Sequence, residues 1–391
     1  MNILFVNLWA LETPTSVSIS NIGLILGMLK NGHHIDFLTG EANSHDSFLE
    51  QLYEEFHEQL HIIRIGPKPI VFVSTTQSKS YKAEIYKWGH RIYRKFSLFD
   101  HSKYLIKNAS LRFLPKRDYD FAVSTSDPKT SHIYLGKLFE QGLKCRKWIQ
   151  HWGDPLSIDI TNNSIYSSNR LVSVEERIYA KSTAIVYVSP ITASLEKELH
   201  PKFAEKIHFV PLSNSSFLWH NICSKQIKMS GKIKIGYFGN YNNTIRNIKP
   251  LYDFVRESAS KYELIIAGES NTKLDQTNNI TVLDRIPSGQ ISTLESECDL
   301  LVCLCNMRGS QIPGKIYYYS GISKPVLIIL DGEYRYEIQE YFGKFGRYLF
   351  CDNNIASIQD RLSMFDTKDR RCNPVFEFLP ESVAREILGL D

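Results

Sequence analysis

The stretch QIPGKIYYYSGISKPVLIIL, residues 311–330, combines a loop, the start of a helix and a buried strand. Its Pro-Gly pair indicates a loop, and residues 315–320 are expected to form a short helix. Pro325 precedes the apolar run VLIIL, which is typical of a strand buried on both faces of a parallel sheet. Lys315 at the helix start favours an anion there, because unpaired amides and the helix dipole attract negative charge. The stretch therefore predicts a phosphate-binding loop beside a parallel strand.

Strands and helices alternate on both sides of this stretch, which predicts an α/β fold with parallel sheets. Strands are expected at residues 2–8, 35–38, 61–65, 120–124, 147–151, 184–188 and 207–210, and again at 233–238, 262–267, 280–283, 300–304, 326–330 and 348–350. A polar, weakly periodic segment at 213–231 separates the two series. We therefore expect domains at 1–215 and 216–375. A terminal helix within 376–391 is expected to pack back on the first domain.

The bulk composition of the chain favours a cytoplasmic protein of two domains. Its 391 residues exceed the ~100–200 that one domain usually holds. An apolar run of membrane-spanning length is absent from the sequence, and the first residues lack the basic start of a secretory signal. The seven cysteines are scattered without the paired spacing of a zinc site, so we expect reduced, structural thiols.

Positive charge is concentrated in residues 79–117, which contain eleven Lys and Arg residues but only two carboxylates. Within this segment the apolar residues recur at helical spacing, at Tyr81, Ile85, Trp88, Ile92 and Phe96. This pattern predicts a basic amphipathic helix. The helix either packs on its own domain with a solvated basic face or lies on anionic lipid. Nucleic-acid binding is not expected, because no recognised motif accompanies the charge.

Several motifs of the chain match one enzyme family. The first half contains STSDP (124–128), WIQHWGDPL (148–156), VSP (188–190) and FVP (209–211), and the second contains GYFG (236–239), Arg246-Asn247, Ala267-Gly268 and the stretch at 311–327. Together they resemble the retaining glycosyltransferases of the GT-B fold, specifically the family-4-like group that builds bacterial surface polysaccharides. The resemblance covers nearly the whole chain and implies two Rossmann-like domains with parallel sheets facing across a cleft.

The resemblance also implies an activity. The enzyme would transfer a sugar, with retention, from a nucleotide-sugar donor to a glycan or lipid-linked acceptor, as in lipopolysaccharide or capsule assembly. Such enzymes need no metal and no cofactor. A basic face within residues 79–117 would then bind the cytoplasmic leaflet of the plasma membrane, where a lipid-linked acceptor is displayed.

The expected site residues follow from this resemblance and from their places after strands. Catalytic roles are expected for His151, Asp154, Arg246 and Lys315, and donor binding for Gly239, Asn240, Arg246, Arg308, Gln311, Lys315 and Tyr318. Arg246 and Lys315 would hold the leaving diphosphate, because fixed positive charge stabilises it. Tyr318 and Ser310 stand where the family usually has carboxylates, and Ser323 where it usually has glycine.

Other interpretations remain open from the sequence. Lys315 and Arg246 could be plain surface cations, and a lone histidine such as His151 is more often structural. The three tyrosines 317–319 are either a core stripe or a platform for the nucleobase. The triplet at 118–120, DYD, leads into a strand and so is expected to lie away from the site rather than to bind metal. A nucleotide-sugar epimerase or hydrolase of the same fold, or a non-catalytic polyanion- or membrane-binding protein, would fit as well.

Overall fold

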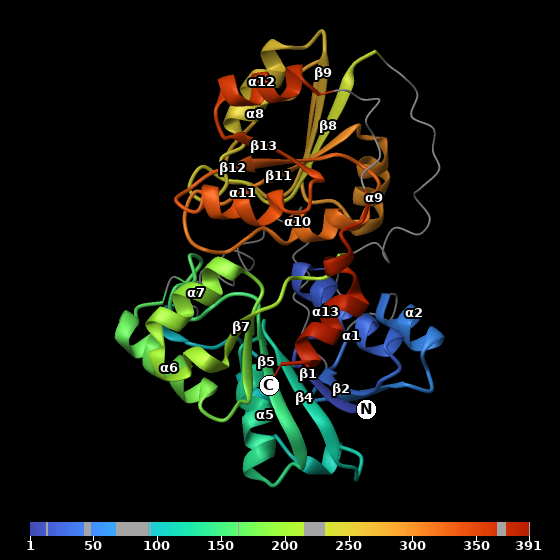
Figure 1. The fold of residues 1–391 in the computed structure, drawn as a ribbon, viewed down its shortest axis with the longest axis vertical. Helices are drawn as coiled ribbons and strands as arrows, with labels where there is room; N and C mark the ends of the chain where they lie inside the picture. Colours follow the sequence, from blue (N-terminus) through green and yellow to red (C-terminus); the bar gives the residue numbers. More distant parts are fainter. Residues whose placement is uncertain are drawn as a thin grey trace, which may run out of the picture. The chain divides into compact units, whose positions relative to one another are not determined.

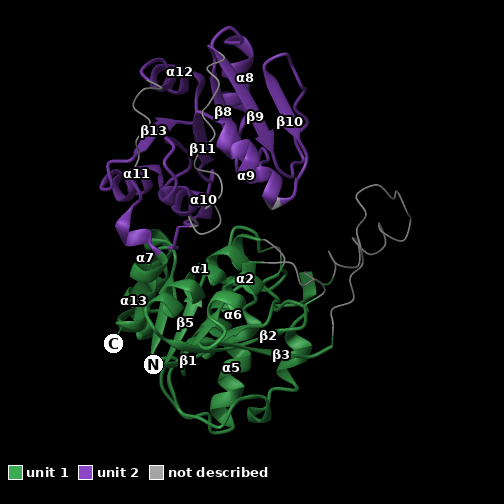
Figure 2. Cartoon of the chain, turned by 90° about the vertical axis from the view of Figure 1, so that its right-hand side faces the viewer, with its two compact units in different colours: residues 1–211, 380–391 green, residues 212–379 purple. Residues whose placement is uncertain are grey.

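The computed structural model describes residues 1–12, 15–42, 48–67, 93, 95–162, 164–214, 231–365 and 373–390. The chain forms two compact units, shown in green and purple in Figure 2. Unit 1 comprises Met1–Pro211 and Pro380–Asp391, and unit 2 comprises Leu212–Leu379. The limits expected from the sequence, 215 and 375, differ from these by a few residues.

Unit 1 is built on a seven-stranded sheet in which every neighbouring pair is parallel (Figure 1). Its strands are β1 Asn2–Asn7, β2 His34–Gly40, β3 Leu60–Ile65, β4 Tyr119–Thr125, β5 Cys145–Trp152, β6 Ala184–Tyr187 and β7 Ile207–Phe209. The strand order is β3-β2-β1-β4-β5-β6-β7. The order reverses between β1 and β4, and in such sheets ligands bind outside the carboxyl ends of the strands at this switch point.

The helices of unit 1 flank this sheet. They are α1 Ser16–Lys30, α2 Phe48–Glu55, α4 Lys103–Ile106, α5 Thr130–Glu140, α6 Ser168–Tyr179, α7 Pro190–Leu199 and α13 Pro380–Leu388, with 3-10 turns η1 Leu111–Phe113 and η2 Pro201–Lys206. Local sequence explains where two of them begin. Thr15 and Ser18 form a capping box at α1, and Ser189 accepts a hydrogen bond from the amide of Thr192 at the start of α7.

The terminal helix α13 packs against α1, so the last helix of the chain belongs to unit 1. Gly27 of α1 makes this approach possible, because a β-carbon there would lie 1.9 Å from the carbonyl oxygen of Pro380. Polar contacts fix the pair: the Asn31 side chain donates to the carbonyl of Glu381 (3.0 Å), and Lys30 forms an ion pair with the Glu381 carboxylate (3.0 Å).

Unit 2 contains a six-stranded parallel sheet in the order β10-β9-β8-β11-β12-β13. Its strands are β8 Ile233–Phe238, β9 Tyr262–Ala267, β10 Ile280–Leu283, β11 Leu300–Leu304, β12 Val326–Leu330 and β13 Tyr348–Asp352. Its helices are α8 Lys249–Glu257, α9 Ser288–Glu297, α10 Gly314–Tyr318, α11 Arg335–Gly343 and α12 Ile355–Ser363, with 3-10 turns η4 Tyr319–Gly321 and η5 Phe376–Phe378. The order reverses between β8 and β11, as it does between β1 and β4.

The stretch at 311–330 forms the predicted loop, short helix and strand. All five residues of β12 are buried, as the run VLIIL indicates. Tyr317 packs edge-to-face on Phe342 and Phe378 and so belongs to an aromatic core cluster, and Tyr318 and Tyr319 are buried as well. The end of this helix is held by Arg347, whose buried guanidinium donates to five backbone carbonyls. These are the carbonyls of Tyr319, Ser320, Ile322, Lys324 and Asn373.

Most sequence-based expectations about the fold are confirmed. Each predicted strand is present within a few residues, and the α/β class with two parallel-sheet units is confirmed. The DYD triplet lies at the start of β4, where Asp120 accepts the backbone amide of Asn2, as expected for a position away from the site. Most of the predicted basic helix, which runs from Tyr81 to Phe96, falls on residues 81–92 and 94 and lies outside the described residues.

Two further expectations concern the thiols and the membrane. The described cysteines Cys145, Cys298, Cys303, Cys305 and Cys351 form no disulfide, while Cys223 and Cys372 lie outside the described residues. Burial raises the pKa of Cys305 to about 12, so this thiol stays protonated. Among the described helices, none combines the length and apolar character that crossing a membrane requires.

Candidate functional site

The loop after β8 begins with a tight backbone contact. A β-carbon on Gly268 would lie 2.0 Å from the carbonyl oxygen of Gly239, so only glycine permits the Gly239 backbone to approach β9. The Asn240 side chain accepts the amide of Glu269 (3.1 Å), and the Tyr237 hydroxyl donates to the Asn240 carbonyl (2.9 Å). These contacts give the predicted donor-binding residues Gly239 and Asn240 a defined backbone path at the end of β8.

Arg246 lies at the switch point of unit 2. Its Nε donates to Oδ1 of Asn306 over 2.8 Å, which joins the loop after β8 to the loop after β11. The same two loops are joined by the amide of Met307, which donates to the carbonyl of Ile245 (2.7 Å). The Asn306 side chain also donates to the carbonyl of Gln311 (2.9 Å). The Arg246 side chain also interacts with the hydroxyl of Tyr237 in β8.

Lys315 lies in the first turn of α10, as predicted, and is already paired. Its Nζ lies 2.8 Å from Oε1 of Glu295 in α9 and 3.0 Å from the Tyr319 hydroxyl. Glu295 is buried, with 3% of its side chain exposed, whereas 33% of the Lys315 side chain is exposed. Lys315 and Arg246 both act electrostatically on the buried thiol of Cys303 in β11, so the two cations belong to one region of unit 2.

The remaining predicted donor-binding residues lie nearby with different exposures. Tyr318 is buried, and its hydroxyl lies 3.2 Å from where a β-carbon of Gly314 would be. Burial raises its pKa, so Tyr318 is neutral and does not supply the negative charge that the resemblance leads one to expect at this position. Arg308 is exposed, and Gln311 contributes its carbonyl to Asn306. Because α10 has only five residues, its helix dipole is small. Most of the positive charge at this place therefore comes from the side chains of Arg246 and Lys315.

His151 occupies the end of β5 in unit 1 and is buried. Burial lowers its pKa to about 4, so the imidazole is neutral at physiological pH. Its Nδ1 has no hydrogen-bond partner among the described residues. His132 of α5 lies within electrostatic range of His151, stacks on Trp152 at 4.4 Å between ring centroids, and bonds the Ser124 hydroxyl at 2.8 Å. A neutral His151 can exchange hydrogen bonds but cannot act as a fixed cation.

Asp154 follows β5 and belongs to a cluster of carboxylates around Lys129. The Lys129 ammonium lies 3.0 Å from Oδ1 of Asp127. Burial lowers the pKa of Lys129, but attraction by Asp127, Asp159 and Asp154 outweighs this effect and the net pKa is raised. Three carboxylates around one ammonium leave this part of unit 1 acidic.

A pocket of about 390 Å³ opens beside this cluster. The loops after β1, β4 and β5 and the segment 97–101 line it, with Trp9, Tyr93, Phe99, Asp127, Lys129, Leu156 and Asp159 among its residues. The switch point of unit 1 lies at the same strand ends, where the Asn7 side chain donates to the Thr125 hydroxyl (2.8 Å) and to the Asp127 carbonyl (3.0 Å). Aromatic side chains and carboxylates in one pocket suit a polyhydroxylated ligand, because aromatic faces pack on the apolar side of a sugar ring.

The structure thus brings the predicted residues together in two groups. Arg246, Gly239, Asn240, Gln311, Lys315 and Tyr318 surround the strand ends of unit 2, and His151 and Asp154 lie at the strand ends of unit 1. Sequence reasoning missed Asn306, Glu295, Asn7 and Lys129. A polar residue near the carboxyl end of a predicted buried strand is a usable signal: Asn7 lies within the predicted strand 2–8, and Asn306 lies two residues after the predicted strand 300–304.

Solved structures with the same fold span the whole chain. Anabaena HepE in complex with UDP and glucose is similar over 99% of this chain and 95% of its own, at 12% identity and a TM-score of 0.56. The catalytic domain of Arabidopsis thaliana starch synthase IV, bound to ADP and acarbose, is similar over 100% and 95%, at 8% identity and a TM-score of 0.61. The fold is the GT-B fold of glycosyltransferases.

Sucrose-phosphate synthase from Thermosynechococcus elongatus shares the fold over 100% of this chain and 94% of its own, at 12% identity and a TM-score of 0.53. By contrast, the sequence matches no family model and no curated protein. The likeness therefore lies in the arrangement of strands and helices.

Proposed function

We propose that this protein is a glycosyltransferase that moves a sugar from a nucleotide-sugar donor to a glycan or lipid-linked acceptor. The observation that carries the proposal is the bond between Arg246 and Asn306 across the switch point of unit 2. It holds a half-buried guanidinium at the strand ends where parallel sheets bind ligands. Lys315 adds a second cation in the same region. Two cations at this place suit a nucleoside diphosphate.

The chemistry of the transfer fits these residues. When the sugar–phosphate bond breaks, negative charge develops on the leaving diphosphate, and fixed cations stabilise it. Arg246 can present two parallel N–H groups to phosphate oxygens, while Lys315 acts as a point charge. A departing phosphate oxygen can accept the proton of the acceptor hydroxyl, and this route leads to retention. We propose that the reaction needs no metal, since the two cations take the role that a metal ion would have.

The acceptor is assigned to the pocket of unit 1. Two of its carboxylates, Asp127 and Asp159, can accept hydrogen bonds from sugar hydroxyls, and the exposed Trp9 offers an aromatic face. His151 is neutral, so it can bond a hydroxyl without adding charge. Asp154 can orient the attacking hydroxyl. These features support a glycan acceptor over an anionic one, because the acidic cluster repels anions.

The cellular role we propose is assembly of a bacterial surface polysaccharide on the cytoplasmic side of the plasma membrane. The basis is the excess of positive charge in residues 79–117, which suits an anionic leaflet. Replacing Lys103, Lys107 and Lys116 by Glu, all in the described part of this segment, should weaken binding to vesicles of phosphatidylglycerol. Unchanged binding would exclude this part of the segment as the membrane contact.

The transferase proposal is tested by a screen of nucleotide sugars. A donor present at 100 times its dissociation constant should raise the free energy of unfolding by about 2.7 kcal/mol. Incubation of the stabilising donor with n-octyl glycosides, with and without EDTA, should yield a glycosylated product in both cases. Release of an epimerised nucleotide sugar without any acceptor would instead show an epimerase. Absence of a thermal shift with all UDP, GDP, CMP and dTDP sugars would favour a non-catalytic protein.

A further inference from the structure

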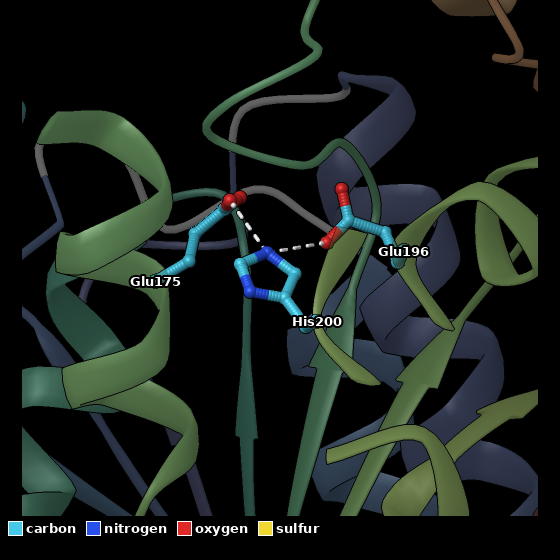
Figure 3. Close-up of side chains that lie close together, drawn as sticks. All are labelled: Glu175, Glu196 and His200. Carbon is cyan, nitrogen blue, oxygen red and sulfur yellow. Dashed lines mark hydrogen bonds and ion pairs between the residues drawn. The ribbon is translucent and has the colours of Figure 1, made fainter. Parts of the chain in front are cut away.

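A buried cluster of two glutamates and a histidine lies in unit 1 outside the residues assigned above. Glu175 comes from α6, Glu196 from α7, and His200 follows the end of α7 (Figure 3). All three side chains are 0% exposed. Nε2 of His200 lies 3.2 Å from Oε2 of Glu175 and 3.3 Å from Oε2 of Glu196. Figure 3 shows this edge of the ring between the two carboxylates.

The other oxygen of Glu175 holds the loop after β5. Its Oε1 accepts the backbone amides of Leu156 and Ser157, the latter at 3.0 Å. The carbonyl of Leu156 in turn accepts the side chain of Asn162 (2.9 Å). Leu156 and Asn162 line the pocket of unit 1, and Asp154 lies two residues before Leu156. One buried carboxylate therefore fixes the backbone from which the pocket residues project.

The rest of the cluster orients this carboxylate. A buried carboxylate needs donors for both oxygens, because an unpaired charge in the interior is costly. His200 supplies the donor for Oε2 of Glu175. His200 is itself held by Glu196, whose Oε2 also accepts the hydroxyl of Tyr179 (3.0 Å). Glu196 therefore contacts His200, His200 contacts Glu175, and Glu175 contacts the loop after β5.

The same three residues could be taken for a metal site, as the one such group of His, Cys, Asp and Glu in the described part of the chain. Two observations disfavour this interpretation. A histidine that binds metal almost always donates its second ring nitrogen to an acceptor, but Nδ1 of His200 has no partner among the described residues. In addition, two amides and the Tyr179 hydroxyl already occupy carboxylate lone pairs. A shared proton explains the cluster better.

We propose that Glu175, oriented by His200, is a positioning residue that sets the loop at 153–162 for acceptor binding. The inference rests on the proposed glycosyl transfer and assigns a determinant of acceptor affinity in that reaction. Glu175 lies behind the loop, because its carboxylate is fully buried and its Oε1 faces the loop amides. It acts on the acceptor through the backbone of the loop rather than by touching the sugar.

The test compares Glu175→Leu, which removes both acceptors, with Glu175→Gln, which keeps an oxygen for the two amides. In Glu175→Leu, hydrogen exchange at the amides of Leu156 and Ser157 should accelerate by about tenfold or more. The KM for the n-octyl glycoside that the wild type uses best should rise by about tenfold, while hydrolysis of the donor in water stays within about twofold. Glu175→Gln should restore both values to within about threefold of the wild type.

A second variant and a control complete the experiment. His200→Phe fills the space but removes the donor to Glu175, so it should raise the same KM and exchange rates even if Glu175→Leu fails to fold. Asp36→Asn is the matched control, because buried Asp36 accepts the Tyr119 hydroxyl at 2.7 Å in the same unit without touching the loop. It should lower the melting temperature but leave the acceptor KM unchanged.

Three outcomes would overturn the inference. The first is transfer with an unchanged acceptor KM in Glu175→Leu and His200→Phe. The second is stoichiometric metal in the purified protein that is lost on replacing Glu196. The third is a wild type that transfers no sugar at all, which overturns the proposed function and the inference with it. Unchanged KM in an active enzyme overturns the inference alone, so the two failures are distinguishable.

Discussion

The ammonium of Lys315 lies 2.8 Å from Oε1 of Glu295, so the cation assigned to the diphosphate is already paired within the protein. The Tyr319 hydroxyl also donates to the same oxygen of Glu295. This buried carboxylate holds Lys315 in one place and at the same time neutralises part of its charge. An ammonium has three protons, and the two contacts to Glu295 and Tyr319 leave one for a ligand.

Lys315→Ala should reduce transfer by about 10² to 10³, since it removes one fixed charge from the leaving group. The substitution also leaves Glu295 without its cation, which lowers stability. The double variant Lys315→Ala with Glu295→Gln should recover stability but not turnover. Single-turnover rates and urea unfolding separate the two effects. The control is Lys249→Ala, at an exposed lysine paired with Asp253. Recovery of turnover in the double variant would contradict the assigned role.

Asn306→Ala should weaken nucleotide-sugar binding by about fivefold to tenfold, the loss expected for one hydrogen bond to a charged group. The bond from Arg246 to Asn306 fixes the direction of the guanidinium, so the variant leaves the charge in place but lets it move. Calorimetric titration with the donor measures the change. Asn271→Ala, on the exposed loop after β9, is the control and should bind as the wild type does. If Asn306→Ala and Asn271→Ala bind the donor with equal affinity, the hydrogen bond from Arg246 to Asn306 is not needed for donor binding.

His151 should make the protein less stable in acid. Burial lowers its pKa to about 4, whereas an unfolded histidine titrates near 6.5. Between these values the unfolded state binds a proton that the native state does not, so stability falls as pH decreases from 6.5 to 4. His151→Asn should reduce this fall when urea unfolding is compared at pH 7.5 and pH 5. His132 is also buried and its pKa is lowered by burial, so adding His132→Asn should reduce the fall further.

His200 should have the opposite effect. Burial lowers its pKa, but hydrogen bonds to Glu175 and Glu196 outweigh burial and raise the pKa to about 9. The native state therefore keeps a proton that the unfolded state loses above 6.5, and the resulting stabilisation is lost as pH rises through 9. Among the described residues, the ionisable groups that contact His200 are these two carboxylates and Tyr179, whose ring lies 5.1 Å from the imidazole between centroids. His200→Asn should remove the decline between pH 6.5 and 9 in thermal unfolding; an unchanged decline would place its origin elsewhere.

Gly27→Ala should destabilise unit 1 by about 1 to 3 kcal/mol, because the new methyl group would overlap the carbonyl of Pro380 and displace α13. Gly289→Ala in α9 is the control, since nothing lies within 4 Å of its β-carbon. Alanine is also the better helix former, so that variant should be neutral or slightly stabilised. Urea unfolding of the two variants gives the comparison. A neutral Gly27→Ala would show that α13 packs less closely.

Much of the fold could be predicted because local patterns specify it. The run VLIIL in β12 is long enough for a buried strand and too short for a helix, and its Pro325 boundary is a local signal. The alternation of such runs with amphipathic segments is also local, and it leads directly to parallel sheets. Lys315 could be placed at the start of a helix because Pro313 and Gly314, directly before it, are also a local signal.

The partners of the site residues could not be predicted, because they depend on contacts between elements. Glu295 lies on the preceding helix, and no spacing in the sequence links it to Lys315. Glu196 and His200 have the (i, i+4) spacing of a surface pair, yet both are fully buried. Burial, which also makes His151 neutral, is a property of the packed unit rather than of any short pattern.

Helix α13 follows unit 2 in the chain but completes unit 1. During synthesis, the face of α1 around Gly27 therefore stays uncovered until the ribosome has translated all of Leu212–Leu379. Unit 2 is one continuous segment and can fold as soon as it has emerged. Unit 1 begins first and finishes last, so its nascent form exposes apolar surface that chaperones can bind for the whole of that interval.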